Sequence, residues 1–508
     1  TPFLLIALRA GAQKDGDPSK ASSYLFDQNY DAALEEYLGL LEEDPDNSVY
    51  NYNVGVCYVN SNFEKLKAIP YLEKVLYYDK FQYNAYYMMA RAYHFDHQFD
   101  EAIAMYTKFK LNAPGSNTKD LDIDRQIEYC ENAKALTKYP VPVKFENLGS
   151  NINSEYPDYF PFIPTSENFL IFNSRRDDGS RMTRSGLFAS NVYISTVQDG
   201  EYAPARPVSQ EVNTDNGNEA VVGLSYTGEK VLFQLDNKEK DASQLYLSEK
   251  VGDVIKPPVL LDETINSTNN EISACISKDG RSIYFASKRK GGFGGKDIYI
   301  TRMLPTGEWG EPENLGPGVN TEYDEDFPNL APDEKSLYFS SKGHFGIGGY
   351  DIFVAKFDAD TRKFLAPRNL GYPINDIGDD LNFRVSKSGR YGYIAAVREE
   401  GFGDFDIYRV TFQEVLTELT VVKGIVSSKA GKPEGTTITV TSTDPTNDYL
   451  GIFVPNANTN RYIVVLPPGE YNMMVETPGY GTVERVFRIL GKGSFEAERT
   501  EDIQLEKN

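Results

Sequence analysis

The sequence has few of the residues that carry most catalytic and metal-binding chemistry. Only three histidines and three cysteines occur among 508 residues. The cysteines, Cys57, Cys130 and Cys275, are odd in number and are not spaced as metal ligands, so we expect buried free thiols rather than a disulfide framework. No serine, cysteine or aspartate lies in a recognisable nucleophile motif. We therefore expect no enzyme activity, no catalytic residue, no metal site and no cofactor.

Positive charge and long apolar runs are also scarce. The chain has 52 Lys and Arg against 75 Asp and Glu, a formal net charge of −23, and the acidic residues are spread along its whole length. Binding to nucleic acid or to anionic lipid needs concentrated Lys and Arg, so neither is an expected partner. The acidity is typical of a soluble surface. No run reaches the roughly 18 apolar residues of a membrane helix, so we expect no transmembrane segment.

The first twelve residues resemble the end of a secretory signal. An apolar stretch from Phe3 to Leu8 is followed by the small residues Ala10-Gly11-Ala12. We therefore expect residues 1–12 to be a signal-peptide remnant and the protein to be exported.

A sequence unit repeats through the middle of the chain. A pair of Ile or Val with Asn occurs five times, and each pair is followed by strand-like runs and turns. The third strand of each unit begins near Asn191, Gln244, Asp297, Asp351 and Asp406, 53 to 55 residues apart. Units of this length with several strands are typical of propeller blades, so residues 140–415 are predicted to form a five-bladed β-propeller. A degenerate sixth blade would escape this count.

The repeat also predicts how the ring closes. Each Ile/Val-Asn pair ends a proline-containing segment, which favours an outermost strand. One such segment precedes every blade and none follows the last blade, which ends near Phe412. We therefore expect Val143–Leu148 to be the edge strand of the fifth blade.

Residues 13–139 repeat at a different period. Small residues recur about every 34 residues: Ala21 and Ala33 are followed by Gly55 and Ala68, and then by Ala90 and Ala102. Tyr37 and Tyr106 hold the same position in the first and third sets. This spacing resembles tetratricopeptide repeats, which are pairs of helices that touch through small residues. Three repeats and a capping helix with Ile123 and Ile127 on its apolar face are predicted.

The last segment, residues 416–508, alternates apolar and polar residues between Gly and Pro turns. This pattern predicts a small antiparallel sandwich. Its motifs Gly-Ile-Val, Leu-Pro-Pro-Gly-Glu-Tyr and Pro-Gly-Tyr resemble the transthyretin-like regulatory domain of carboxypeptidases, a noncatalytic module. The predicted fold class is therefore an all-α tetratricopeptide solenoid, an all-β propeller and a transthyretin-like β-sandwich.

Two sets of residues are candidate binding sites. A recurring acidic position lies just before the innermost strand of each blade, where five carboxylates could form a negative mouth of the central channel for a cation or a basic peptide end. The alternative, which we favour, is that these side chains fix the ring by accepting backbone hydrogen bonds. The residues concerned are Glu155, Glu219, Glu271, Glu325 and Asp380.

The second candidate is the concave face of the helical repeats, because aromatic and arginine side chains anchor many protein interfaces. The alternative is that the protein's own capping helix or propeller fills this groove. The predicted partner-binding residues are Tyr52, Val56, Val59, Tyr87, Arg91 and His94.

Two weaker patterns are interpreted as structural. His94 and His97 lie beside Asp96 and Asp100, but solvated side chains are favoured over a surface metal site. The glycine-rich loop Ser287–Asp297 could cradle a phosphate, yet similar loops recur in later blades, which favours a turn between strands.

The order of these domains resembles the periplasmic adaptor of the type IX secretion system of Bacteroidetes. The resemblance covers nearly the whole chain and implies a non-enzymatic periplasmic scaffold that links protein partners of an envelope assembly to the cell envelope. It also implies an association of this scaffold with the outer membrane complex. Such adaptors usually continue into an OmpA-like domain, so any peptidoglycan association would belong to residues beyond Asn508. The alternatives are a propeller that binds cell-wall peptides or sugars, and an accessory platform of a hydrolase.

Overall fold

The computed structural model describes residues 16–62, 64–79, 82–214, 217–237, 242–267, 271–413, 419–444, 449–491 and 496–507. The expected signal remnant, residues 1–12, lies outside them. Two compact units are present. The first comprises the chain up to Cys130 with Ser180–Phe188, and the second comprises Glu131–Gly179 with Ala189–Asn508. The predicted domain boundaries at residues 139 and 415 remain predictions.

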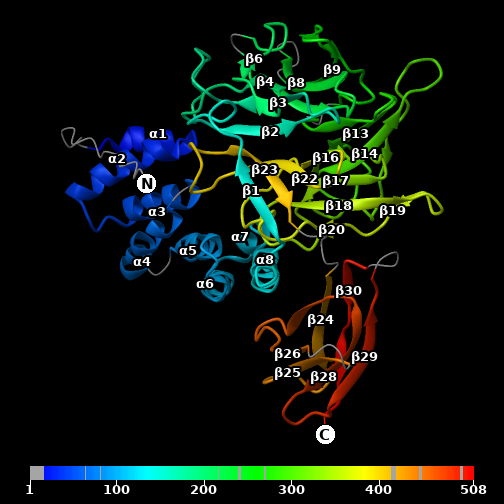
Figure 1. Cartoon of the computed structure of the whole chain (residues 1–508). Coiled ribbons are helices and arrows are strands. Elements are labelled where there is room, and N and C mark those ends of the chain that lie inside the picture. The colour runs from blue at the N-terminus through cyan, green and yellow to red at the C-terminus, as the bar shows by residue number, and fades with distance from the viewer. Residues whose placement is uncertain are drawn as a thin grey trace. The chain divides into compact units, whose positions relative to one another are not determined.

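The first unit is helical (Figure 1). Its elements are α1 (Pro18–Phe26), α2 (Tyr30–Glu43), α3 (Ser48–Asn60), the 3₁₀ turn η1 (Lys65–Lys67), α4 (Ala68–Tyr78), α5 (Asn84–Phe95), α6 (Phe99–Asn112), α7 (Gly115–Asp120) and the start of α8 (Ile123–Leu136). None of the described helices is long and apolar enough to cross a membrane.

Local sequence explains where these helices begin and how they touch. The side chains of Asp17 and Asn47 accept hydrogen bonds from the first backbone amides of α1 and α3, as N-caps do. Gly55 in α3 lies against Leu72 in α4, and a Cβ atom at Gly55 would lie 2.5 Å from a methyl carbon of that leucine. The predicted small residues therefore mark close helix contacts, and Ala21, Ala33, Ala68, Ala90 and Ala102 are all fully buried.

The second unit is mostly β-sheet and its larger part is propeller-like. Five antiparallel sheets follow one another between Val143 and Phe412. The first sheet contains β2 (Asp158–Phe162), β3 (Phe169–Ser174), β4 (Asn191–Gln198), β5 (Glu201–Tyr202) and β6 (Arg206–Pro207). The second contains β7 (Ala220–Leu224), β8 (Lys230–Asn237), β9 (Ala242–Val251), β10 (Val254–Ile255) and β11 (Val259–Leu260).

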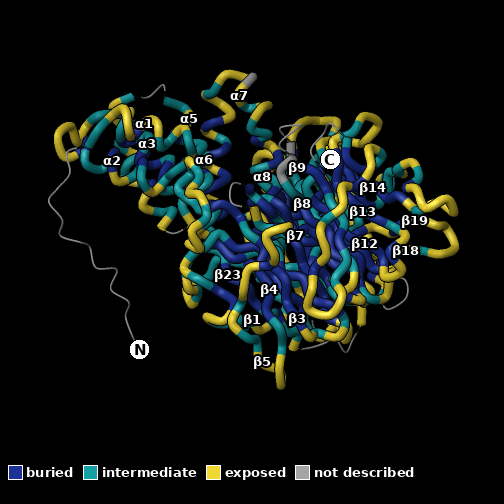
Figure 2. Tube along the Cα trace, turned by 90° about the horizontal axis from the view of Figure 1, so that it is seen from above, coloured by how far each residue is buried: buried dark blue, intermediate teal, exposed yellow. Residues whose placement is uncertain are grey.

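The remaining three sheets repeat this order. The third contains β12 (Ala274–Ile276), β13 (Ser282–Ser287), β14 (Asp297–Arg302) and β15 (Glu313–Asn314). The fourth contains β16 (Glu325–Leu330), β17 (Ser336–Ser341), β18 (Asp351–Asp358), β19 (Lys363–Phe364) and β20 (Arg368–Asn369). The fifth contains β21 (Arg384–Val385), β22 (Tyr391–Ala396), β23 (Asp406–Phe412) and β1 (Val143–Asn147). Figure 2 shows that the buried residues follow inner strands such as β7 and β12.

The strand β1 joins the fifth sheet although it precedes the first. It pairs antiparallel with β23 over five residues, from Val143 opposite Phe412 to Asn147 opposite Tyr408. This is the edge pairing that the repeat predicts. Because β1 leads directly into the first sheet, the pairing connects the beginning of the β-region to its end.

The C-terminal part of the second unit packs two sheets around one apolar core. One sheet contains β24 (Thr420–Ser428), β27 (Arg461–Leu466), β30 (Glu498–Thr500) and β31 (Ile503–Leu505). The other has the order β26 (Leu450–Phe453), β25 (Thr437–Ser442), β28 (Gly469–Glu476) and β29 (Val483–Ile489). The sequence predicts an antiparallel sandwich, but β24 pairs parallel with β30 and β31, so the region contains both kinds of strand pairing.

Candidate functional site

The asparagine of each Ile/Val-Asn pair acts as a short piece of strand. Asn320 accepts a hydrogen bond from the backbone N–H of Ile298 (2.8 Å) and its Nδ2 donates to the carbonyl of the same residue (3.0 Å). Both ends of the amide are thus bonded to the third strand of the preceding sheet. The same two bonds join Asn153 to Ile407, Asn213 to Val192, Asn266 to Leu245 and Asn375 to Ile352.

Four of the five predicted acidic residues are buried beside these asparagines. The carboxylate of Glu325 accepts hydrogen bonds from the backbone and side chain of Thr321 and from Ser341, each at 2.7 Å. Glu271 makes the equivalent bonds with Ser267 and Ser287. The side chain of Thr214 donates to Glu219, and the backbone of Asp376 donates to Asp380. Each of these carboxylates therefore accepts a hydrogen bond from a residue four or five positions earlier in the chain, which fits the structural alternative, and the channel-mouth role stays a prediction.

In the first sheet the acidic residue equivalent to the others is Asp158 rather than the predicted Glu155. Its side chain is exposed, whereas Asp158 is fully buried and accepts hydrogen bonds from the backbone (2.6 Å) and hydroxyl (2.8 Å) of Ser154. Arg176 pairs with the other carboxylate oxygen of Asp158 at 2.6 Å. Asp158 lies five residues after Asn153, which is the spacing found for Glu271, Glu325 and Asp380 after their asparagines, and it is thus the equivalent position.

The same acidic residues connect neighbouring sheets through their backbone. The N–H of Asp158 donates to the carbonyl of Phe405 in the loop before β23 (2.7 Å), which links the first sheet to the fifth. Corresponding bonds join Glu219 to Ser190, Glu325 to Lys296 and Asp380 to Tyr350. Burial raises the pKa of Glu325 to about 7 and raises that of Asp380 as well. Since a raised carboxylate pKa also occurs in catalytic acids, the repetition of the geometry is what favours a structural role.

The glycine-rich loops bind carboxylates of the protein itself. The backbone N–H of Phe293 donates to Asp297 at the start of β14 (2.6 Å), and Phe402 donates to Asp406 in the same way. A Cβ atom at Gly292 would lie 1.8 Å from Asp297 Oδ2. The loop Ser287–Asp297 thus surrounds an internal anion, which explains its glycines without a bound phosphate.

The strand β21 contains a buried arginine that sequence reasoning missed. Arg384 donates to the side chain of Asn329 (2.7 Å) and to the carbonyls of Leu224 (2.9 Å) and Ile163 (3.1 Å). Its guanidinium lies 3.5 Å from the ring centre of Tyr226. These partners belong to the first, second and fourth sheets, so one side chain ties several inner strands together. No sequence signal distinguishes it from a surface arginine.

The residues predicted for the helical groove do not all reach the surface. Val59 and His94 are buried, with 0% and 4% of their surface exposed, and so cannot anchor a partner directly. Tyr52 and Val56 on α3, and Tyr87 and Arg91 on α5, are half-buried. Four of the six predicted residues therefore remain candidates for contact.

The half-buried residues form a connected group on α3 and α5. Arg91 Nη1 donates to Asn60 Oδ1 at 3.0 Å, which links the two helices. The ring of Tyr87 packs against Tyr106 and Phe109 of α6, with centroids 5.9 and 5.7 Å apart. Burial, with a smaller contribution from Tyr87, raises the pKa of Tyr52 to about 12. Tyr87 is less exposed than the sequence predicts.

The histidine and cysteine candidates fit structural roles. His94 and His97 both pack against the ring of Phe99, at centroid distances of 6.0 and 5.4 Å. Cys57, Cys130 and Cys275 are buried and are not joined in disulfides, as predicted. Among the residues that the structure describes, no group of three or more His, Cys, Asp or Glu side chains is arranged to hold a metal ion.

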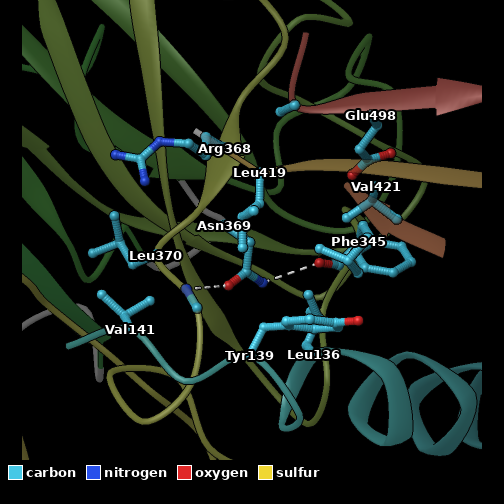
Figure 3. Close-up of a pocket in the computed structure, with 13 residues that line it drawn as sticks. Leu136, Tyr139, Val141, Phe345, Arg368, Asn369, Leu370, Leu419, Val421 and Glu498 are labelled. Carbon is cyan, nitrogen blue, oxygen red and sulfur yellow. Dashed lines mark hydrogen bonds between the residues drawn. The ribbon is translucent and has the colours of Figure 1, made fainter. Parts of the chain in front are cut away.

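A small cavity lies within the second unit (Figure 3). It has a volume of about 80 Å³, and Figure 3 shows Tyr139 and Phe345 facing it from different segments. Asn369 donates to the carbonyl of Phe345 (3.0 Å) and accepts from the N–H of Gly371 (2.7 Å), so its polar lining is internally bonded. Ligand pockets usually measure about 300–1,000 Å³, so this cavity is smaller than a typical ligand pocket and is a gap between packed segments.

No protein family and no curated protein matches the chain by sequence. Several solved structures resemble it. An endo-arabinase from Bacteroides thetaiotaomicron is 12% identical with a TM-score of 0.34, and the match covers 55% of this chain and 98% of that one. TolB from Acinetobacter baumannii is 14% identical with a TM-score of 0.32, over 57% and 70% of the two chains. A β-xylosidase/α-arabinofuranosidase from a compost microbial metagenome is 12% identical with a TM-score of 0.35, over 53% and 93%. Likeness at this level carries no argument about what this chain does.

Proposed function

We propose that this protein is a non-enzymatic scaffold of the bacterial periplasm, an adaptor of the type IX secretion system. In this proposal the helices form three tetratricopeptide repeats, the five sheets form a five-bladed propeller, and the C-terminal region is a carboxypeptidase-regulatory-like sandwich. The order of these parts along the chain and their sequence motifs support the assignment.

The connected group on α3 and α5 is the observation on which the scaffold role rests. Tyr52, Tyr87 and Arg91 present aromatic and cationic side chains that are partly exposed and held in place by neighbouring helices. Preordered side chains of these types lose little conformational entropy when a partner binds. The proposed partner is another protein of the envelope complex, bound through an extended or helical segment.

Charge reversal at Arg91 tests this binding role. The variant Arg91→Glu should fold, because Arg91 is half-buried and the substitution removes its hydrogen bond to Asn60 without opening the core, but it should lose the main protein that co-purifies from envelope extract. The matched control is Lys108→Glu, which makes the same change of charge at an exposed position of α6. Retention of the partner by folded Arg91→Glu would contradict the proposed surface.

The secretion role needs a separate test. A strain that lacks this chain should fail to release type IX cargo, and the wild-type gene should restore release while the Arg91→Glu gene should not. Normal secretion without the chain would contradict the adaptor role. Saturable binding of cell-wall oligosaccharides or peptides to the purified chain, measured by calorimetry, would instead support the alternative of a cell-wall binding protein.

A further inference from the structure

The strand β26 at one edge of the C-terminal region carries a row of exposed apolar side chains. Leu450, Ile452 and Val454 are 63%, 67% and 73% exposed. A spacing of two places Leu450 and Ile452 on one side of β26, and Val454 directly follows the last residue of the strand. Phe453, which alternates with them, packs against the apolar core. The row is therefore the outward side of a well-anchored strand.

This strand is also an open edge. In the described residues β26 pairs with β25 alone, from Ile438 opposite Phe453 to Thr441 opposite Leu450. Its other side offers backbone donors and acceptors to an added strand. An extended chain is the kind of partner that satisfies such groups.

The opposite edge of the same sheet is protected. The strand β29 exposes Glu484, Arg485 and Arg488, and charged side chains of this kind prevent pairing between edges. By contrast, residues 449–460 contain no Asp, Glu, Lys or Arg, although a quarter of the chain is charged. One edge of the sheet thus resists strand addition and the other does not.

We propose that β26 pairs antiparallel with β26 of a second copy of this chain. Pairing centred on Ile452 would place Ile452 opposite its copy and, with the strand extended by one residue, Leu450 opposite Val454. Every outward pair would then be apolar, and cross-strand apolar pairs stabilise sheets. An interface formed by one uncharged strand is its own complement under a twofold axis. The strand that matches β26 in this way is β26 itself, so the partner is a second copy of this chain.

The size of this contact and the charge of the chain predict its strength. Stable interfaces bury at least about 1,200 Å², and one added strand buries less than this area. The dissociation constant of the dimer should therefore lie in the micromolar range. Each copy has a net charge of −23, so repulsion between copies opposes association. Added salt screens this repulsion, and the dimer should therefore tighten as salt rises, which is opposite to an interface of ion pairs.

Sedimentation of the full chain at about 1–200 μM tests the proposal. We expect a monomer–dimer equilibrium in the wild type. In Ile452→Lys the dissociation constant of the dimer should rise about 10-fold, because one apolar cross-strand pair is lost and two lysines meet across the twofold axis. The matched control is Val486→Lys on β29, where the side chain is 73% exposed, and it should associate as the wild type does. A wild type that remains monomeric, or equal loss in both variants, would overturn the proposal.

Cross-linking tests the register independently. The three native cysteines are buried, so a single introduced cysteine is the accessible thiol. Ile452→Cys should form a disulfide-linked dimer under mild oxidation, and Val486→Cys should not. A monomeric Ile452→Cys would overturn the self-pairing, including the case in which it cross-links to a strand of another protein in envelope extract.

Discussion

The sequences of the helical unit and of the propeller-like region both contain recurring positions, but residues of different chemistry occupy them. In the helices the recurring positions are small and apolar, and Gly55 and Ala68 let backbones approach each other. In the sheets the recurring positions are polar. The buried side chain of Asn320 bonds to the backbone of Ile298, and the buried carboxylate of Glu325 accepts hydrogen bonds from Thr321 and Ser341. A recurring polar residue in this protein is therefore a connector between sheets before it is a candidate ligand.

Removal of the edge strand β1 should cause the largest loss of stability among the changes that test this comparison. A chain that begins at residue 140 keeps β1, whereas a chain that begins at residue 151 leaves β23 with an unpaired edge. It also loses the bonds of Arg409 to Glu146. We expect the shorter chain to lose at least about 5 kcal/mol, the lower end of domain stabilities, and to aggregate.

Thermal melts of the two truncated chains measure this effect. Both lack the helical unit, so the comparison isolates β1. Equal melting temperatures would show that the pairing of β1 with β23 does not stabilise the propeller-like region.

The choice between Glu155 and Asp158 should give the next largest effect. Asp158→Ala leaves Arg176 without its buried partner and should cost about 3–5 kcal/mol of unfolding free energy. Glu155→Ala changes an exposed side chain and should stay within about 0.5 kcal/mol. Urea unfolding followed by the fluorescence of Trp309, the chain's one tryptophan, gives both values. A larger cost for Glu155→Ala than for Asp158→Ala would show that Glu155 is the stabilising acidic residue of the first sheet.

This pair also shows what the sequence could predict. The repeat length, the edge strand β1 and the buried cysteines follow from periodicity and composition. The acidic position of the first sheet was ambiguous because Glu155 and Asp158 lie close together, and the spacing after the asparagine would have resolved it. Arg384 and the burial of His94 depend on side chains from distant segments, which no local pattern specifies.

The buried carboxylate of Glu325 predicts a dependence of stability on pH. Burial raises its pKa from 4.5 to about 7, so the folded state binds a proton more tightly than the unfolded state. The stability that this proton provides is fully present below pH 4.5 and is lost as pH rises through about 7. The pKa difference corresponds to about 3 kcal/mol. Relative to Glu325→Gln, the wild type should therefore lose about this much between pH 4.5 and pH 8.

Glu249 provides the matched control for this pH dependence. Hydrogen bonds from Lys230 and Lys256 lower its pKa to about 2, so its contribution is constant above about pH 5. The unfolding free energies of wild type and Glu249→Gln should hence differ by the same amount at pH 5 and pH 8. If Glu325→Gln shows the same constant difference, then Glu325 is not buried as a partly protonated acid.

The helical repeats should show the smallest effect, and through packing rather than hydrogen bonds. Gly55→Ala introduces a Cβ atom 2.5 Å from a side-chain carbon of Leu72, and this overpacking should cost about 1–2 kcal/mol. Gly115→Ala at the start of α7 meets no atom within 4 Å and should be neutral or stabilising by up to about 1 kcal/mol, since alanine favours helix. Unfolding followed by helical circular dichroism compares the two variants directly. If Gly55→Ala were as stable as Gly115→Ala, the helices would tolerate a wider separation. Close apolar contact would then not be what holds the helices together, in contrast to the polar connections between the sheets.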